Sequence, residues 1–90
     1  MSASDQDLPP IRAAEQVPAG LYRHYKGGMY EVIDLARHSE SLEVMVVYRA
    51  LYGSRGLWVR PAQMFNEHIT IEGEVRPRFE RLSDPKGDNG

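Results

Sequence analysis

The sequence contains no cysteine, which excludes a disulfide scaffold, a thiolate zinc site and a thiol nucleophile. It also has no apolar run approaching the roughly 20 residues that a membrane-spanning helix needs. The first residues lack the basic start and the apolar stretch of a secretory signal. We therefore expect a soluble, cytoplasmic protein without a membrane partner.

Both ends of the chain are poor in the residues that build a core. Residues 1–18 contain no aromatic residue and include a Pro-Pro pair, and residues 83–90 contain only turn-forming and charged types. Neither segment can bury enough apolar surface to offset the entropy lost when its backbone is ordered. We expect flexible tails at 1–18 and 83–90 around one folded domain at 19–82, which holds all eight aromatic residues.

A strong charge of either sign is also missing. The net charge is −2, and residues 19–82 carry nine Arg/Lys against eight Asp/Glu. This near-neutral balance argues against a dedicated binder of bulk nucleic acid, which usually has a strongly basic face. Eight of the nine cations are arginines, the residue type suited to bidentate contacts with carboxylate or phosphate. Any anion-binding patch is therefore expected to be local.

Short segments rich in β-branched and aromatic residues alternate with glycine turns. Leu21–Lys26 and Met29–Ala36 predict a hairpin around Gly27 and Gly28. Apolar residues alternate regularly along Leu42–Tyr52, which predicts a long strand. A glycine turn and the short strand Leu57–Arg60 follow.

The last third of the domain predicts one helical turn and further strands. Pro61–Asn66 is expected to form the turn, with Met64 and Phe65 directed inward. Ile69–Ile71 and Phe79–Leu82 are candidate strands around a turn at Gly73. The pattern predicts an all-β fold, a small antiparallel β-barrel of about five strands with one short helical turn. Closure of such a barrel would remove the exposed edges that an open sheet leaves.

Four stretches of the sequence carry a family resemblance: YRHYKGGMYEV, ARHSE, VVYRALYG and WVRPAQMF. Over about Gly20 to Leu82 the chain resembles an uncharacterised bacterial family, the domain of unknown function DUF1653. The resemblance implies an SH3-like β-barrel, in agreement with the strand pattern. It implies no activity, substrate or catalytic residue. Small barrels of this kind mostly act as binding modules, which is an analogy at the level of the fold.

Aromatic and cationic side chains gather between Gly20 and Arg60. Tyr22, His24 and Lys26 share one face of the first predicted strand and, if that face is exposed, form a platform for flat or anionic groups. The alternative is that the tyrosine packs in the core while His24 and Lys26 are solvated. Trp58 is either a core residue or an exposed platform. The candidate ligand-binding residues are Tyr22, His24, Lys26, Tyr48, Arg49, Trp58 and Arg60.

The sequence carries no catalytic or metal signature. His24, His38 and His68 lie 14 and 30 residues apart, whereas a catalytic zinc site needs about three convergent ligands. We expect no metal and no cofactor. The best acid–base candidate is His24 with Glu31 or Asp34 across the first hairpin, and an ordinary cross-strand ion pair is the simpler alternative.

These observations favour a non-enzymatic binding module that presents an aromatic and arginine surface to a protein segment or a small anionic ligand. One alternative is binding of single-stranded nucleic acid or a nucleotide. Another is a small enzyme or enzyme accessory that uses His24 with Glu31 or Asp34. An uncovered barrel edge would allow self-association, so the expected state is a monomer or a weak homodimer.

Overall fold

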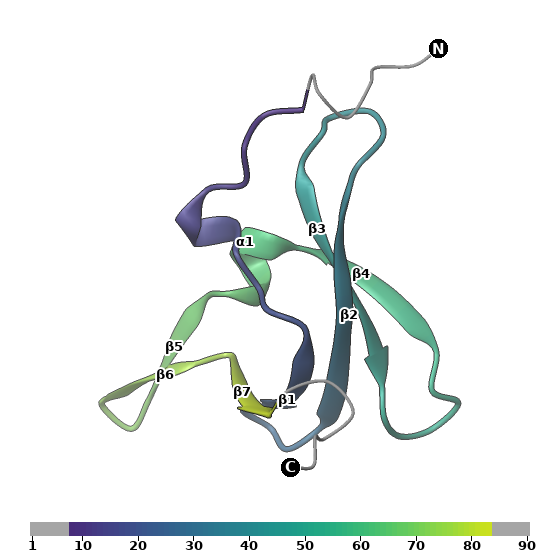
Figure 1. The fold of residues 1–90 in the computed structure, drawn as a ribbon. Coiled ribbons are helices and arrows are strands. Elements are labelled where there is room, and N and C mark those ends of the chain that lie inside the picture. Colours follow the sequence, from purple (N-terminus) through teal and green to yellow (C-terminus); the bar gives the residue numbers. More distant parts are fainter. Residues whose placement is uncertain (1–7, 84–90) are drawn as a thin grey trace.

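The computed structural model describes residues 8–83 and has an all-β fold with one short helix (Figure 1). Its seven strands form two antiparallel sheets, a five-stranded sheet in the order β4-β3-β2-β1-β7 and a hairpin of β5 and β6. The elements are the 3₁₀ turn η2 (Ala13–Glu15), β1 (Gly20–His24), β2 (Met29–Arg37), β3 (Val44–Ala50), β4 (Leu57–Pro61), α1 (Ala62–Phe65), β5 (His68–Ile71), β6 (Glu74–Pro77) and β7 (Phe79–Ser83).

Strand β3 lies inside the sheet and confirms the alternation predicted along this segment. Its burial alternates without a break, with Val44, Val46, Tyr48 and Ala50 buried and the residues between them partly exposed. The buried set lies on the inner face, which packs against α1 and the core. Directly paired residues of neighbouring strands point to the same side of a sheet. The residues of β2 and β4 that pair with the buried residues of β3 therefore also point to the inner face.

The helical turn predicted within Pro61–Asn66 is present as α1 at Ala62–Phe65, but it directs only one of the two named side chains inward. Phe65 is 1% exposed, whereas Met64 is 44% exposed. A single helical turn has one buried face, and Ala62 and Phe65, three residues apart, occupy it. The prediction that Met64 points inward is therefore wrong.

The two strands predicted around Gly73 are present as β5 and β7, and β6 lies between them. Gly73 has φ +83° and turns β5 directly into β6, with Ile71 paired to Glu74. Phe79 instead pairs with His24, so β7 adds to the edge of the large sheet beside β1. In Figure 1 the β5–β6 hairpin projects from the body of the domain.

Closure into a barrel is not seen in the described residues. The large sheet ends at β4 on one side and β7 on the other, and these two strands are not paired. Residues 8–83 form seven strands where about five were predicted. Register shifts between Val32 and Asp34 of β2, and between Leu21 and Tyr22 of β1, mark irregularities that bend and twist a sheet.

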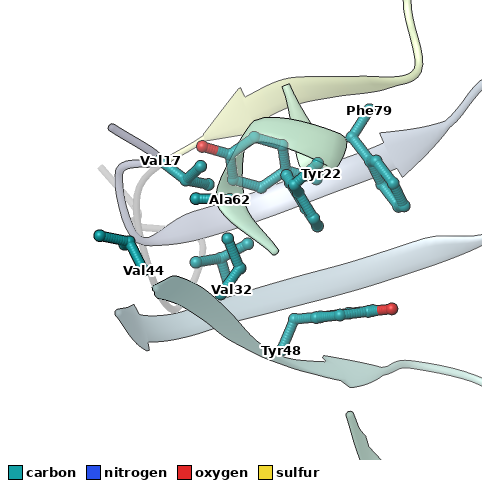
Figure 2. Close-up of a cluster of buried hydrophobic side chains, with 9 residues drawn as sticks. Val17, Tyr22, Val32, Val44, Tyr48, Ala62 and Phe79 are labelled. Atoms are coloured by element: carbon teal, nitrogen blue, oxygen red, sulfur yellow. The ribbon is translucent and has the colours of Figure 1, made fainter. Parts of the chain in front are cut away.

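The core lies between the inner face of the large sheet and α1. The Phe65 ring stacks on Phe79, with centroids 4.0 Å apart and planes inclined by 8°. Tyr22 and Tyr48 meet Phe65 edge-on at 5.4 and 5.5 Å. Figure 2 shows Tyr48 and Phe79 on one side of this cluster and Val44 on the other. The buried cluster consists of Val17, Tyr22, Val32, Val44, Val46, Tyr48, Ala62, Phe65 and Phe79.

The residues before β1 pack on this core. Val17 is 4% exposed, and Ile11 packs against the buried cluster. The Asn66 side chain donates hydrogen bonds of 3.0 Å to the carbonyls of Ala14 and Gln16, which attaches the segment to the end of α1. The described part of the predicted tail 1–18 thus contributes to the folded body. Of the other predicted tail, 83–90, the structure describes Ser83, the last residue of β7.

Candidate functional site

The inner face of β2, β3 and β4 extends past the core into a hollow of about 410 Å³ beside the loop between β3 and β4. We call this hollow the aromatic–arginine pocket. It is lined by Tyr30, Tyr48, Ala50, Tyr52, Gly53, Ser54, Arg55, Gly56, Trp58 and Arg60.

Strand register brings these side chains to one face. Tyr48 pairs with Trp58 across β3 and β4, and Tyr30 pairs with Ala50 across β2 and β3. The loop reverses direction through Gly53 and Arg55, which have φ values of +60° and +58°. That turn completes the rim of the pocket.

Two tyrosine hydroxyls meet at the pocket wall. The hydroxyl oxygens of Tyr30 and Tyr52 are 2.5 Å apart and share a hydrogen bond. The Tyr30 ring is held edge-on by Tyr48, Tyr52 and Phe79 at 5.5 to 5.6 Å. Burial, with the hydrogen bond to Tyr52 as the second cause, raises the pKa of Tyr30 to about 12. Its phenol is therefore neutral over the physiological range and keeps its proton.

Arg60 supplies a positive charge in the pocket wall. Its Nε donates to the Tyr48 hydroxyl at 3.5 Å, and its guanidinium carbon lies 5.8 Å from the centroid of the Phe79 ring. Within residues 8–83, neither Arg60 nor Arg55 forms an ion pair. The lining therefore contains two arginines and no carboxylate.

Trp58 is exposed, which answers the question left open by the sequence. Its side chain is 59% exposed, and no ring among the described residues contacts the indole. Its neighbours Leu57 and Val59 are 55% and 59% exposed on the opposite face. β4 is an edge strand, so Trp58 has no further strand beside it to cover the ring.

Tyr22, His24 and Lys26 do not form the platform considered from the sequence. Tyr22 is 5% exposed in the core, and burial raises the pKa of its hydroxyl. The His24 ring is half-buried against Phe79, 4.8 Å away and edge-on. Lys26 is exposed, with its Nζ 5.7 Å from the centroid of the Tyr25 ring. The reason is that Tyr22 and His24 point to the inner face of the sheet, whereas β1 ends at His24 and Lys26 lies in the turn that follows.

Arg49 lies on the outer face of the sheet and does not line the pocket, but it contacts the loop that forms the rim of the pocket. Its Nη1 donates a 2.7 Å hydrogen bond to the carbonyl of Arg55. This bond attaches the loop that forms the rim to the middle of the sheet. Of the seven candidate residues, the structure thus brings Tyr48, Trp58 and Arg60 together in the pocket.

The acid–base pairing considered for His24 is wrong. Glu31 pairs with Leu21 and Arg49, and Asp34 pairs with Val47, which places both carboxylates on the outer face. His24 shares the inner face with Tyr22 because alternate residues of a strand point the same way. No group of three His, Asp or Glu side chains in residues 8–83 converges as metal ligands.

A second hollow of about 250 Å³ lies at the C-terminal end of β1 and is lined by His24. Arg23 and Glu80, which both line it, form an ion pair at 3.6 Å. Burial, followed by the positive charges of Arg78, Lys26 and Arg60, lowers the pKa of His24. Arg76 also lines this hollow and is paired with Glu74 at 3.5 Å. Because both arginines are already paired, the hollow has less to offer an anion than the aromatic–arginine pocket.

Tyr30 and Tyr52 are pocket residues that the sequence did not single out. Tyr52 continues the alternation of Tyr48 and Ala50, which was the available signal for its face. Tyr30 joins the site through its pairing with Ala50 and its contact with Tyr52. Neither the pairing nor the contact can be read from local spacing.

Fold and site together define a small all-β domain with an aromatic hollow at the open end of its core. The chain belongs to the family of proteins of unknown function DUF1653, whose model matches residues 20–81. It is similar to a DUF1653 protein from Bordetella bronchiseptica known from a crystal structure, with 35% identity and a TM-score of 0.72. The match covers 84% of this chain and 100% of that one. A comparison with curated proteins found no match.

In the part of the chain that the structure describes, α1 is the one α-helix and has four residues. No helix there has the length and apolar character that a bilayer crossing requires.

Proposed function

We propose that this domain is a non-enzymatic binding module whose aromatic–arginine pocket receives a small anionic ligand with a flat portion. The observation that carries the proposal is Trp58, which is 59% exposed at the rim of a hollow that also contains Arg60. An exposed indole forgoes roughly 1–2 kcal/mol of burial free energy. A ligand that covers the ring recovers this free energy on binding.

The charge of the lining supports an anion over a cation. Aromatic pockets that hold ammonium groups attract them with the negative faces of their rings. Here Arg60 and Arg55 would repel such a cation, and the lining has no carboxylate to offset them. The forked guanidinium group is suited to carboxylate or phosphate instead.

The direct test is an NMR titration that follows the indole N–H of Trp58, the only tryptophan in the chain. Phenyl phosphate combines a flat ring with an anion, whereas phenol lacks the charge and tetramethylammonium reverses it. We expect phenyl phosphate to shift the Trp58 signal at lower concentration than either of the other two. Equal responses to all three, or none, would refute the proposal.

Two arginine variants provide a matched comparison. Arg60→Met removes the pocket charge and retains a long apolar side chain, so it should weaken phenyl phosphate binding by roughly tenfold. Arg23→Met removes a charge on the outer face, where Arg23 is paired with Glu80, and should leave binding unchanged. The same loss in both variants would mean that overall charge, rather than the pocket, governs binding.

A protein segment is the second candidate ligand, and the edge strand β4 favours it. Leu57 and Val59 are 55% and 59% exposed on β4, whose outer edge has no partner strand among residues 8–83. An extended peptide could add to such an edge through backbone hydrogen bonds. Hydrogen exchange of the Leu57 and Val59 amides would slow on peptide addition. Exchange that is unchanged in the presence of a bound peptide would exclude this mode.

We also propose that the bent five-stranded sheet is an open relative of the SH3-like barrels. The side-chain contacts between its edges support this relationship. Helix α1 directly follows β4 and carries Phe65, which stacks at 4.0 Å on Phe79 of β7. Packing thereby links the two edges that backbone pairing leaves apart.

A further inference from the structure

The polar groups of the aromatic–arginine pocket distinguish between kinds of flat ligand. In the Tyr30–Tyr52 pair one hydroxyl donates to the other. The accepting hydroxyl keeps its own proton, which it can donate to a ligand, and both oxygens retain lone pairs. The raised pKa of Tyr30, about 12, keeps the Tyr30 phenol protonated. The wall thus offers both a donor and an acceptor, which suits a ring with polar atoms along its edge.

The remaining groups match a stacked ring that carries an anion. The Trp58 indole is not covered by another ring of the described residues, and an uncovered indole face is a stacking surface for any heteroaromatic ring. Arg60 and Arg55 line the same hollow without an acidic partner in residues 8–83. A ring stacked on Trp58 would therefore have its anionic substituent within a positively charged lining.

We propose that the aromatic–arginine pocket binds a nucleoside monophosphate unit, with the base against Trp58 and the tyrosine pair and the phosphate at Arg60 and Arg55. This inference rests on the function proposed above and specifies its ligand. The unit is the same in a free nucleotide and in a single strand. The volume of about 410 Å³ has room for one such unit, and the near-neutral body gives no extended basic track for a long strand.

The test compares adenosine 5′-monophosphate with probes that each lack one part of it. Adenosine lacks the phosphate, ribose 5-phosphate lacks the base, and phenyl phosphate lacks a base with polar edges. Affinities are measured from the Trp58 indole signal on the full chain. We expect adenosine 5′-monophosphate to bind most tightly, by roughly tenfold over each of the other three.

Two exposed pocket residues allow variants that retain the fold. Trp58→Ala should lower the nucleotide affinity by roughly tenfold, now measured by calorimetry because the tryptophan is lost. Tyr52→Phe removes one hydroxyl at a position that is 53% exposed. It should weaken the nucleotide several-fold and affect phenyl phosphate less, because phenyl phosphate has no polar ring edge. Tyr25→Phe, outside the pocket and 37% exposed, is the matched control and should change neither affinity.

The outcomes separate this inference from the proposed function. If phenyl phosphate binds and the nucleotide binds no more tightly, the nucleotide assignment is overturned while the binding module stands. If no anionic probe binds, both are overturned. Binding of a short single-stranded oligoadenylate shows whether the nucleotide unit comes from a strand or from a free nucleotide. Tighter binding than the mononucleotide, with a steeper loss in salt, indicates a strand, whereas equal or weaker binding indicates a free nucleotide.

Discussion

Removal of the Phe65 ring tests whether α1 holds the two edges of the sheet together. Phe65 is 1% exposed, stacks on Phe79 and meets Tyr22 and Tyr48 edge-on. A buried Phe→Ala substitution costs about 3–5 kcal/mol through lost burial and the cavity left behind. A domain of this size has a total stability of about 4–11 kcal/mol, at roughly 0.05–0.15 kcal/mol per residue.

Phe65→Ala should therefore remove a large share of the free energy of unfolding of the domain. The loss corresponds to a fall in melting temperature of at least about 12 °C, since each kcal/mol shifts the midpoint of a small domain by about 4–8 °C. Thermal and urea unfolding followed by circular dichroism would measure it.

Met64→Ala is the matched control, because Met64 lies on the same helical turn but is 44% exposed. Its effect should stay within about 0.5 kcal/mol. The reasoning would be refuted if Phe65→Ala cost less than about 1 kcal/mol, or if both variants lost the same stability. Either result would mean that α1 does not contribute the core contact that the structure assigns to it.

Three further predictions concern groups outside the α1 core contact. Asn66→Ala removes the hydrogen bonds to Ala14 and Gln16, so it should cost about 1 kcal/mol and speed hydrogen exchange at Gln16. Stability should fall as the pH drops below 6.5, because the lowered pKa of His24 means that the unfolded chain binds this proton first. The decline should be smaller in His24→Gln, measured by urea unfolding at several pH values. Tyr52→Phe should lower the pKa of Tyr30 below about 12, as measured by ultraviolet titration.

Opposite results would identify the error in each case. Unchanged exchange at Gln16 would show that the segment is held without Asn66. The same pH dependence with and without His24 would assign the acid sensitivity to other groups. If the pKa of Tyr30 is the same in Tyr52→Phe as in the unchanged protein, burial alone would account for the raised pKa.

Local patterns in the sequence predict most of the elements. The alternation along β3 and the Gly27-Gly28 turn were both confirmed, because each depends on residues close in the chain. Pairings between distant segments could not be derived in this way. Nothing in the spacing of Phe79 shows that it lies opposite His24, because that contact depends on where β7 meets the sheet.

For the candidate site too, the sequence predicts what depends on neighbouring residues and does not predict contacts between distant segments. Alternation placed Tyr22 and His24 on one face, but the sequence did not determine which face points inward. The inward face proved to be theirs, which moved Tyr22 into the core. Trp58 and Arg60 line the site because β4 is the edge strand beside β3. Tyr30 lines it because it pairs with Ala50 of β3. Each depends on sheet topology, which a single sequence does not specify.

The packing of Val17 has a consequence for where this domain begins. The family model starts at residue 20, whereas Val17 is 4% exposed in the core and Ile11 packs beside it. A fragment cut at the family boundary would lose a core wall along with the segment attached to Asn66. The packed core thus extends beyond the region of shared family sequence, because residues before position 20 supply part of its interior.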